Sequence, residues 1–133
     1  MKAVLADSVY FFALLNPRDR LHACAKRYAA QSSNPILTTA WVLTEVADGL
    51  SERTKRRTVV QLIEILQGAA DVEIIPPSQE LFQRGLERYA QRLDKDWSLT
   101  HCISFVVMEE HGLTEALTAD HHFKQAGFAT LLS

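Results

Sequence analysis

The chain contains few residues of the kinds that cross-link or interrupt a protein chain: two cysteines, four prolines and five glycines among 133 residues. Cys24 and Cys102 lie far apart in the sequence and form no CxxC pair. This spacing argues against a disulfide framework, a redox motif or a cysteine zinc site, and it fits the reducing cytosol. We therefore expect a cytoplasmic protein.

Long apolar segments are missing as well. No stretch approaches the ~20 apolar residues that are needed to span a bilayer, so we expect no membrane association. The first apolar run is interrupted by Asp7 and is too short for the apolar segment of a signal peptide. The chain also has no internal repeat and no low-complexity tract, which excludes a repeat array.

Charge of one sign is not in excess, because the formal net charge is −2 and the pI is about 6.2. That balance argues against binding to nucleic acid through overall charge, but it permits a local basic patch. The chain has one dense basic run, formed by Arg53, Lys55, Arg56 and Arg57. Contact with RNA phosphates is one interpretation of this basic run, and a solvated helix start is the other.

The length and the hydrophobic content are those of an ordinary globular protein. A chain of 133 residues, with 47% hydrophobic and 23% charged residues, can bury a core without disulfide bonds. We therefore expect residues 1–133 to form a single domain.

Short apolar runs alternate with segments of helical periodicity from one end of the chain to the other. We expect strands at residues 3–6, 36–38, 72–77, 116–118 and 128–132. We expect helices at residues 9–15, 19–32, 39–50, 53–68, 79–89, 99–110 and 121–125. Such alternation is typical of βαβ units, so the predicted fold class is α/β, a three-layer α/β/α sandwich around a parallel sheet of about five strands.

Acidic residues stand where the predicted strands end. Asp7 and Asp120 each follow a strand, and Glu45 lies on the helix that follows the second strand. The carboxyl ends of parallel strands meet at one edge of the sheet, where open α/β folds bind ligands. Converging carboxylates repel one another unless a cation lies between them, and Mg²⁺ or Mn²⁺ would relieve that repulsion. Taken singly, each acid could instead be a surface charge or a helix cap, as Asp120 could be for residues 121–125.

His101 lies three residues after Ser98, in the first turn of a predicted helix. An acid is favoured at that position because it can complete a capping box and meet the positive end of the helix. The imidazole could be a metal ligand or a general base. Alternatively, it replaces a carboxylate and leaves the site one acid short.

Four segments carry a resemblance to a known family. They are Val-Leu-Ala-Asp7-Ser, Thr-Thr-Ala-Trp-Val-Leu-Thr-Glu45-Val, Asp-Lys-Asp-Trp-Ser-Leu-Thr-His101-Cys-Ile-Ser-Phe and Glu-Ala-Leu-Thr-Ala-Asp120-His-His-Phe. In these segments the chain resembles the PIN-domain family, in particular the toxin ribonucleases of the VapC type. The resemblance covers nearly the whole chain, and the third segment is its most specific part.

The resemblance implies a metal-dependent endoribonuclease that is the toxin of a toxin–antitoxin pair. The matching acids in the family bind Mg²⁺ or Mn²⁺ and activate water to cleave RNA, which assigns that role to Asp7, Glu45 and Asp120. The position of His101 is normally a metal-binding aspartate, so this departure weakens or abolishes the expected activity, and Asp96 is a substitute ligand to consider. The implied partners are RNA, a protein antitoxin and a second copy of the chain.

Two other functions fit parts of the sequence. A non-catalytic PIN domain that binds RNA or protein is favoured by the imidazole at position 101. A phosphatase or response-regulator-like domain would need a lysine at the end of a later strand, and none follows the strand that ends at Thr118. The apolar residues of segment 9–15 are consistent with a dimer interface or with a helix wholly buried in the core.

Overall fold

The computed structural model describes all 133 residues and contains every predicted element. The strands are β1 (Val4–Ala6), β2 (Ile36–Thr39), β3 (Val72–Ile75), β4 (Glu115–Leu117) and β5 (Ala129–Thr130). The helices are α1 (Ser8–Leu15), α2 (His22–Gln31), α3 (Ala40–Gly49), α4 (Arg56–Gly68), α5 (Gln79–Gln91), α6 (Leu99–Glu110) and α7 (His121–Gln125). None of these helices is both long enough and apolar enough to cross a bilayer.

All five strands are parallel and are ordered β3-β2-β1-β4-β5. The central strand β1 pairs with β2 on one side, where Val4 faces Ile36, and with β4 on the other, where Leu5 faces Ala116. The chain therefore builds outward from β1 in one direction as far as β3 and then in the other direction through β4. This reversal makes the carboxyl ends of β1 and β4 the switch point at which such sheets bind ligands.

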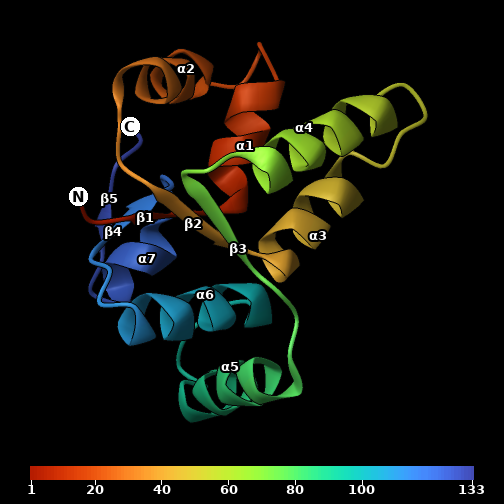
Figure 1. Cartoon of the computed structure of the whole chain (residues 1–133). Helices are drawn as coiled ribbons and strands as arrows, with labels where there is room; N and C mark the ends of the chain where they lie inside the picture. Colours follow the sequence, from red (N-terminus) through yellow and green to blue (C-terminus); the bar gives the residue numbers. More distant parts are fainter.

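Helices cover both faces of the sheet, as Figure 1 shows. Because successive side chains of a strand point to opposite faces, Val4 and Ala6 pack with α1 to α4, whereas Leu5 packs with α5, α6 and α7. The two hydrophobic cores are thus separated by the sheet. The predicted three-layer α/β/α sandwich with a parallel sheet is confirmed.

Helix α6 lies between the sheet and α5, and every residue from His101 to Met108 is buried. The close packing of α5 depends on Gly85, because a Cβ at this position would lie 2.3 Å from Cγ1 of Ile103 on α6. This packing fixes the N-terminal turn of α6, and His101 with it, beside the carboxyl edge of the sheet.

Two predictions from the sequence need correction. Helix α4 begins at Arg56 and not at residue 53, because residues 52–55 form a turn whose Lys55 pairs with Glu52 at 3.8 Å. The apolar segment 9–15, for which a dimer interface and a wholly buried helix were both considered, is neither an exposed patch nor wholly buried. Tyr10, Phe11 and Ala13 are buried, because α1 packs against both α2 and α3. The half-buried apolar side chains are those of Val9, Phe12, Leu14 and Leu15.

Candidate metal centre

Asp7 is the innermost acid of the site and has no solvent exposure. It follows β1 and occupies the N-cap position of α1, yet its side chain does not cap that helix. Oδ2 instead accepts a hydrogen bond from Thr118 Oγ1 at 2.8 Å, while Oδ1 is buried without a partner. Burial raises the pKa of Asp7, whereas the nearby His101 imidazole and the Thr118 hydroxyl lower it.

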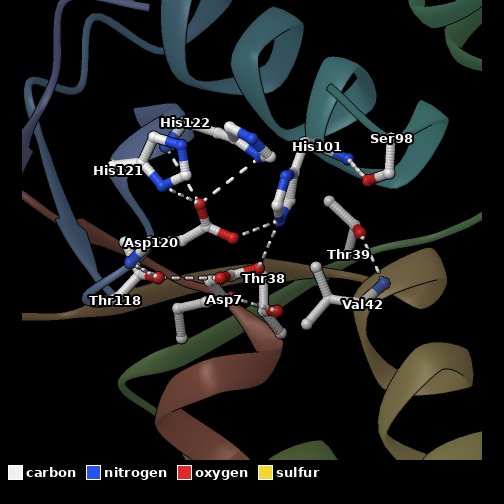
Figure 2. A network of polar contacts seen from close by, with 11 residues as sticks. Asp7, Thr38, Thr39, Val42, Ser98, His101, Thr118, Asp120, His121 and His122 are labelled. Atoms are coloured by element: carbon white, nitrogen blue, oxygen red, sulfur yellow. Dashed lines mark hydrogen bonds and ion pairs between the residues drawn. The ribbon is translucent and has the colours of Figure 1, made fainter. Parts of the chain in front are cut away.

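Asp120 follows β4 and faces Asp7 across the switch point (Figure 2). Its Oδ1 accepts a hydrogen bond from the backbone amide of His122 at 2.9 Å, so the capping role considered from the sequence is confirmed. Its backbone amide donates to Thr118 Oγ1 at 3.1 Å, so one hydroxyl links the two acids. Because Oδ1 makes the cap, Oδ2 of Asp120 remains available to a ligand. The Asp120 side chain is 23% exposed.

His101 stands between the two carboxylates. Its Nε2 lies 3.8 Å from Oδ1 of Asp7 and 3.6 Å from Oδ2 of Asp120 (Figure 2). Ser98 caps α6 by accepting a hydrogen bond from the backbone amide of His101 at 3.0 Å, which fixes the position of the first turn. The ring packs edge-on against Phe123 with centroids 5.2 Å apart. The imidazole is therefore held with one nitrogen directed at the acids.

A second imidazole, not identified from the sequence, belongs to the same cluster. Nδ1 of His122 lies 3.4 Å from Oδ1 of Asp120 and has no hydrogen-bond partner, although it is buried. One ligand-type atom from each of His101, Asp120 and His122 lies within 4.8 Å of the others. The adjacent His121 is 72% exposed at its side chain and is not part of this group. The pair of histidines after Asp120 was the signal in the sequence, but it did not show which ring turns inward.

Glu45 approaches the site from α3 on the other side of the sheet. Thr39 caps that helix by accepting a hydrogen bond from the amide of Val42 at 3.1 Å. Glu45 is half-buried, its Oε1 is enclosed without a partner, and its charge contributes to raising the pKa of Asp7. Glu45 is thus within electrostatic reach of Asp7, although it is not in the group of ligand-type atoms formed by His101, Asp120 and His122.

The other residues considered from the sequence lie elsewhere. Asp96 is exposed and lines a separate cavity with Trp97 and Cys102. It belongs to no group of clustered ligand-type atoms. The basic run at residues 53–57 is solvent-exposed in the turn before α4 and in its first residues.

The cluster has the chemistry that a divalent cation needs. Asp7 and Glu45 each present a buried carboxylate oxygen with no hydrogen-bond partner. Leaving such acceptors unsatisfied is costly, and a cation is the ligand that satisfies several anionic oxygens at once. The residues present therefore fit a divalent cation at the switch point of the sheet.

A profile of the PIN domain family matches residues 4–129. The chain belongs to the PIN domain family. It is 29% identical over 126 residues to the 23S rRNA-specific endonuclease VapC20 of Mycobacterium tuberculosis. The aligned residues cover 94% of this chain and 95% of that protein.

Solved structures of similar proteins have the same fold. The crystal structure of Mycobacterium tuberculosis VapC20, described as a Sarcin-Ricin loop cleaving toxin, superposes with a TM-score of 0.87 at 25% identity and covers 98% of this chain and 99% of that one. VapBC2 of Rickettsia felis, bound to a fragment of promoter DNA, gives a TM-score of 0.66 at 14% identity, with 96% of each chain covered. At 14% identity, the similarity to VapBC2 shows a common fold alone.

Proposed function

We propose that this PIN-domain protein is a metal-dependent endoribonuclease and the toxin of a toxin–antitoxin pair. The observation that carries the proposal is Asp7, a wholly buried carboxylate at the switch point whose Oδ1 has no partner. The similarity to VapC20 along almost the whole chain supports RNA as the substrate class and a toxin as the biological role. A protein antitoxin that restrains the activity is part of the same proposal.

Asp7, Glu45 and Asp120 are the residues that would hold the cation. A bound divalent cation lowers the pKa of water and stabilises negative charge that develops on a phosphate. Asp7 has no exposed surface, so it orients the site and does not touch RNA. Thr118 holds Asp7 by its hydrogen bond, which keeps the unpartnered oxygen directed into the site. Asp120 and half-buried Glu45 stand closer to solvent, where the substrate arrives.

His101 determines how active this chain is with Mg²⁺. Mg²⁺ prefers oxygen ligands, and an imidazole in place of an aspartate leaves the cation with one negative charge fewer. We therefore propose that the chain as it stands has little Mg²⁺-dependent nuclease activity. His101→Asp supplies the missing carboxylate and should produce cleavage with Mg²⁺.

The direct test is cleavage of purified 23S rRNA by the parent, His101→Asp, and the double variant His101→Asp with Asp7→Asn. Each is assayed with Mg²⁺, with Mn²⁺ and with chelator. We expect His101→Asp to cleave with Mg²⁺ and the double variant to lose that cleavage. Asp96→Asn in the His101→Asp background is the matched control, because Asp96 is an exposed acid outside the cluster. Cleavage that persists in chelator, or in the double variant, refutes the proposed mechanism.

The position of His101 also supports a second candidate function, a non-catalytic domain that binds RNA or protein. An imidazole whose nitrogen lies 3.6 Å and 3.8 Å from two carboxylates can pair with them without any metal. In that case neither the parent nor His101→Asp cleaves RNA with any cation, whereas a gel-shift assay detects an RNA complex that survives chelator.

Three further expectations from the sequence remain proposals. We propose that residues 1–133 act as one domain, since both hydrophobic cores share a single sheet. We propose that the basic run contacts RNA phosphates, since all of its side chains are accessible. We also propose a homodimer, which now needs an interface other than the buried side of α1.

A further inference from the structure

Two imidazoles and two carboxylates converge at the carboxyl edge of β1 and β4. His101 approaches from α6, His122 from α7, Asp120 from the end of β4 and Asp7 from the end of β1 (Figure 2). Nδ1 of His122 and Oδ1 of Asp7 are both buried and have no hydrogen-bond partner. These atoms have been removed from water without a replacement, which is costly unless a ligand satisfies them.

The spacing of the donor atoms suits a small cation. Nδ1 of His122 lies 3.4 Å from Oδ1 of Asp120. Nε2 of His101 lies 3.6 Å from the other oxygen of Asp120, Oδ2, and 3.8 Å from Oδ1 of Asp7. Ligands held about 2.0–2.2 Å from a tetrahedral zinc ion lie roughly 3.3–3.6 Å from one another. One ligand-type atom from each of His101, Asp120 and His122 lies within 4.8 Å of the others, so these donors need to move together by up to about 1.5 Å to enclose a cation.

The nature of the donors selects the cation. Mg²⁺ prefers an all-oxygen shell and gains little from imidazole nitrogen. Mixed imidazole and carboxylate donors suit Zn²⁺ and Co²⁺, and transition metals bind such sites more tightly than the alkaline-earth ions do. An imidazole ligand brings no negative charge, so the site attracts a hard cation less than one with carboxylates at both positions would.

We propose that this chain holds a transition-metal ion of the zinc type, bound by Nε2 of His101, Nδ1 of His122 and the carboxylate of Asp120, with Asp7 supplying the second carboxylate. The two histidines thus change the cation preference of the site from magnesium to a softer metal. The inference rests on the proposed function for the location of the site, but it concerns metal binding and makes no use of RNA cleavage.

The first experiment measures binding directly. Metal-stripped protein is titrated with Zn²⁺, Co²⁺, Mn²⁺ and Mg²⁺ by calorimetry, and the Co²⁺ complex is examined by visible absorption. We expect Zn²⁺ and Co²⁺ to bind at least about 10-fold more tightly than Mg²⁺, and Co²⁺ to give the intense bands of a four-coordinate site. Equal affinity for Mg²⁺ and Zn²⁺, or the weak bands of hydrated Co²⁺, would overturn the proposal.

Variants identify the ligands. His122→Asn should weaken Zn²⁺ binding by about 10-fold or more, since even the loss of an outer-shell partner costs about 10–100-fold. His121→Asn is the matched control, because His121 is the adjacent imidazole but is largely exposed. His101→Asp should weaken Zn²⁺ binding and strengthen Mg²⁺ binding. Thermal denaturation of each metal-free variant reports whether it is folded.

The outcomes separate the site from the function. Zn²⁺ binding that is lost in His122→Asn and retained in His121→Asn supports the site, even when no RNA is cleaved with any metal. That combination counts against the proposed ribonuclease function but not against the metal site. Zn²⁺ binding that both His101→Asp and His122→Asn leave unchanged places the ion elsewhere and refutes the inference, whatever the RNA assay shows.

Discussion

The substitution Asp7→Asn should stabilise the metal-free protein. Asparagine has nearly the same shape, and its side-chain oxygen can still accept the hydrogen bond from Thr118. It removes a buried negative charge whose Oδ1 has no partner and which feels the charge of Glu45. The amide nitrogen of asparagine takes the place of Oδ1 and is also unpartnered, but a neutral unsatisfied group costs about 1–3 kcal/mol and a charged one costs more. We therefore expect the free energy of unfolding at neutral pH to rise by roughly 1–3 kcal/mol, or the Tm by about 3–10 °C.

The pH dependence of stability gives an independent check with a definite sign. Burial raises the pKa of Asp7 above the ordinary value of an aspartate, so the metal-free folded state binds a proton more tightly than the unfolded state does. The contribution of Asp7 to the free energy of unfolding is fully present below the pKa that this residue has in the unfolded state. It decreases as the pH rises from there through the folded pKa, and it is then constant. In Asp7→Asn this decrease should disappear.

At saturating metal the parent should be more stable than Asp7→Asn, which is the reverse of the order expected in chelator. A cation that binds only the folded state at 100 times its Kd stabilises the parent by about 2.7 kcal/mol, whereas Asp7→Asn lacks the central carboxylate and gains little. The assay is denaturant unfolding of both proteins over a pH series, with chelator and with Zn²⁺ or Mn²⁺. If Asp7→Asn is less stable than the parent in chelator, or if metal stabilises both proteins equally, the reasoning about Asp7 is refuted.

Four other outcomes are expected. Expression of His101→Asp should arrest growth where the parent does not, and normal growth together with intact 23S rRNA would contradict the toxin assignment. Neutralising the basic run should weaken RNA binding and lower its salt dependence by roughly one unit of slope per lost phosphate contact, whereas an unchanged slope would assign the run to solvation. Light scattering at micromolar concentration should detect a dimer, and a monomer would count against it. Gly85→Val should destabilise the fold by about 1–3 kcal/mol in chemical denaturation, because its Cβ would collide with Ile103, and an unchanged midpoint would contradict that packing.

Much of the architecture could be predicted because local and global signals agree. Short apolar runs marked the strands, and the caps Thr39, Ser78 and Ser98 each accept the hydrogen bond that a helix start requires. The strand ends also located Asp7 and Asp120, since parallel strands leave their carboxyl ends at one edge.

Other features depended on contacts between distant segments. The burial of α1 results from α2 and α3 packing on either side of it, which a periodic pattern cannot report. The late start of α4 follows from a turn that contains the Lys55–Glu52 pair. The choice of His122 over His121 depends on which ring α7 directs inward, and that follows from how Asp120 caps this short helix.

The hydrogen bond from Thr118 to Asp7 joins residues that are 111 positions apart. Contacts of such long range form late in folding, because a large loop must close before they contribute. During synthesis, Asp7 and Glu45 leave the ribosome long before Thr118, Asp120 and His122 exist. A growing chain that has not reached residue 118 lacks Thr118, Asp120 and His122, and its site is therefore incomplete. The order of the strands thus places assembly of the site after the synthesis of β4 and of the residues that follow it.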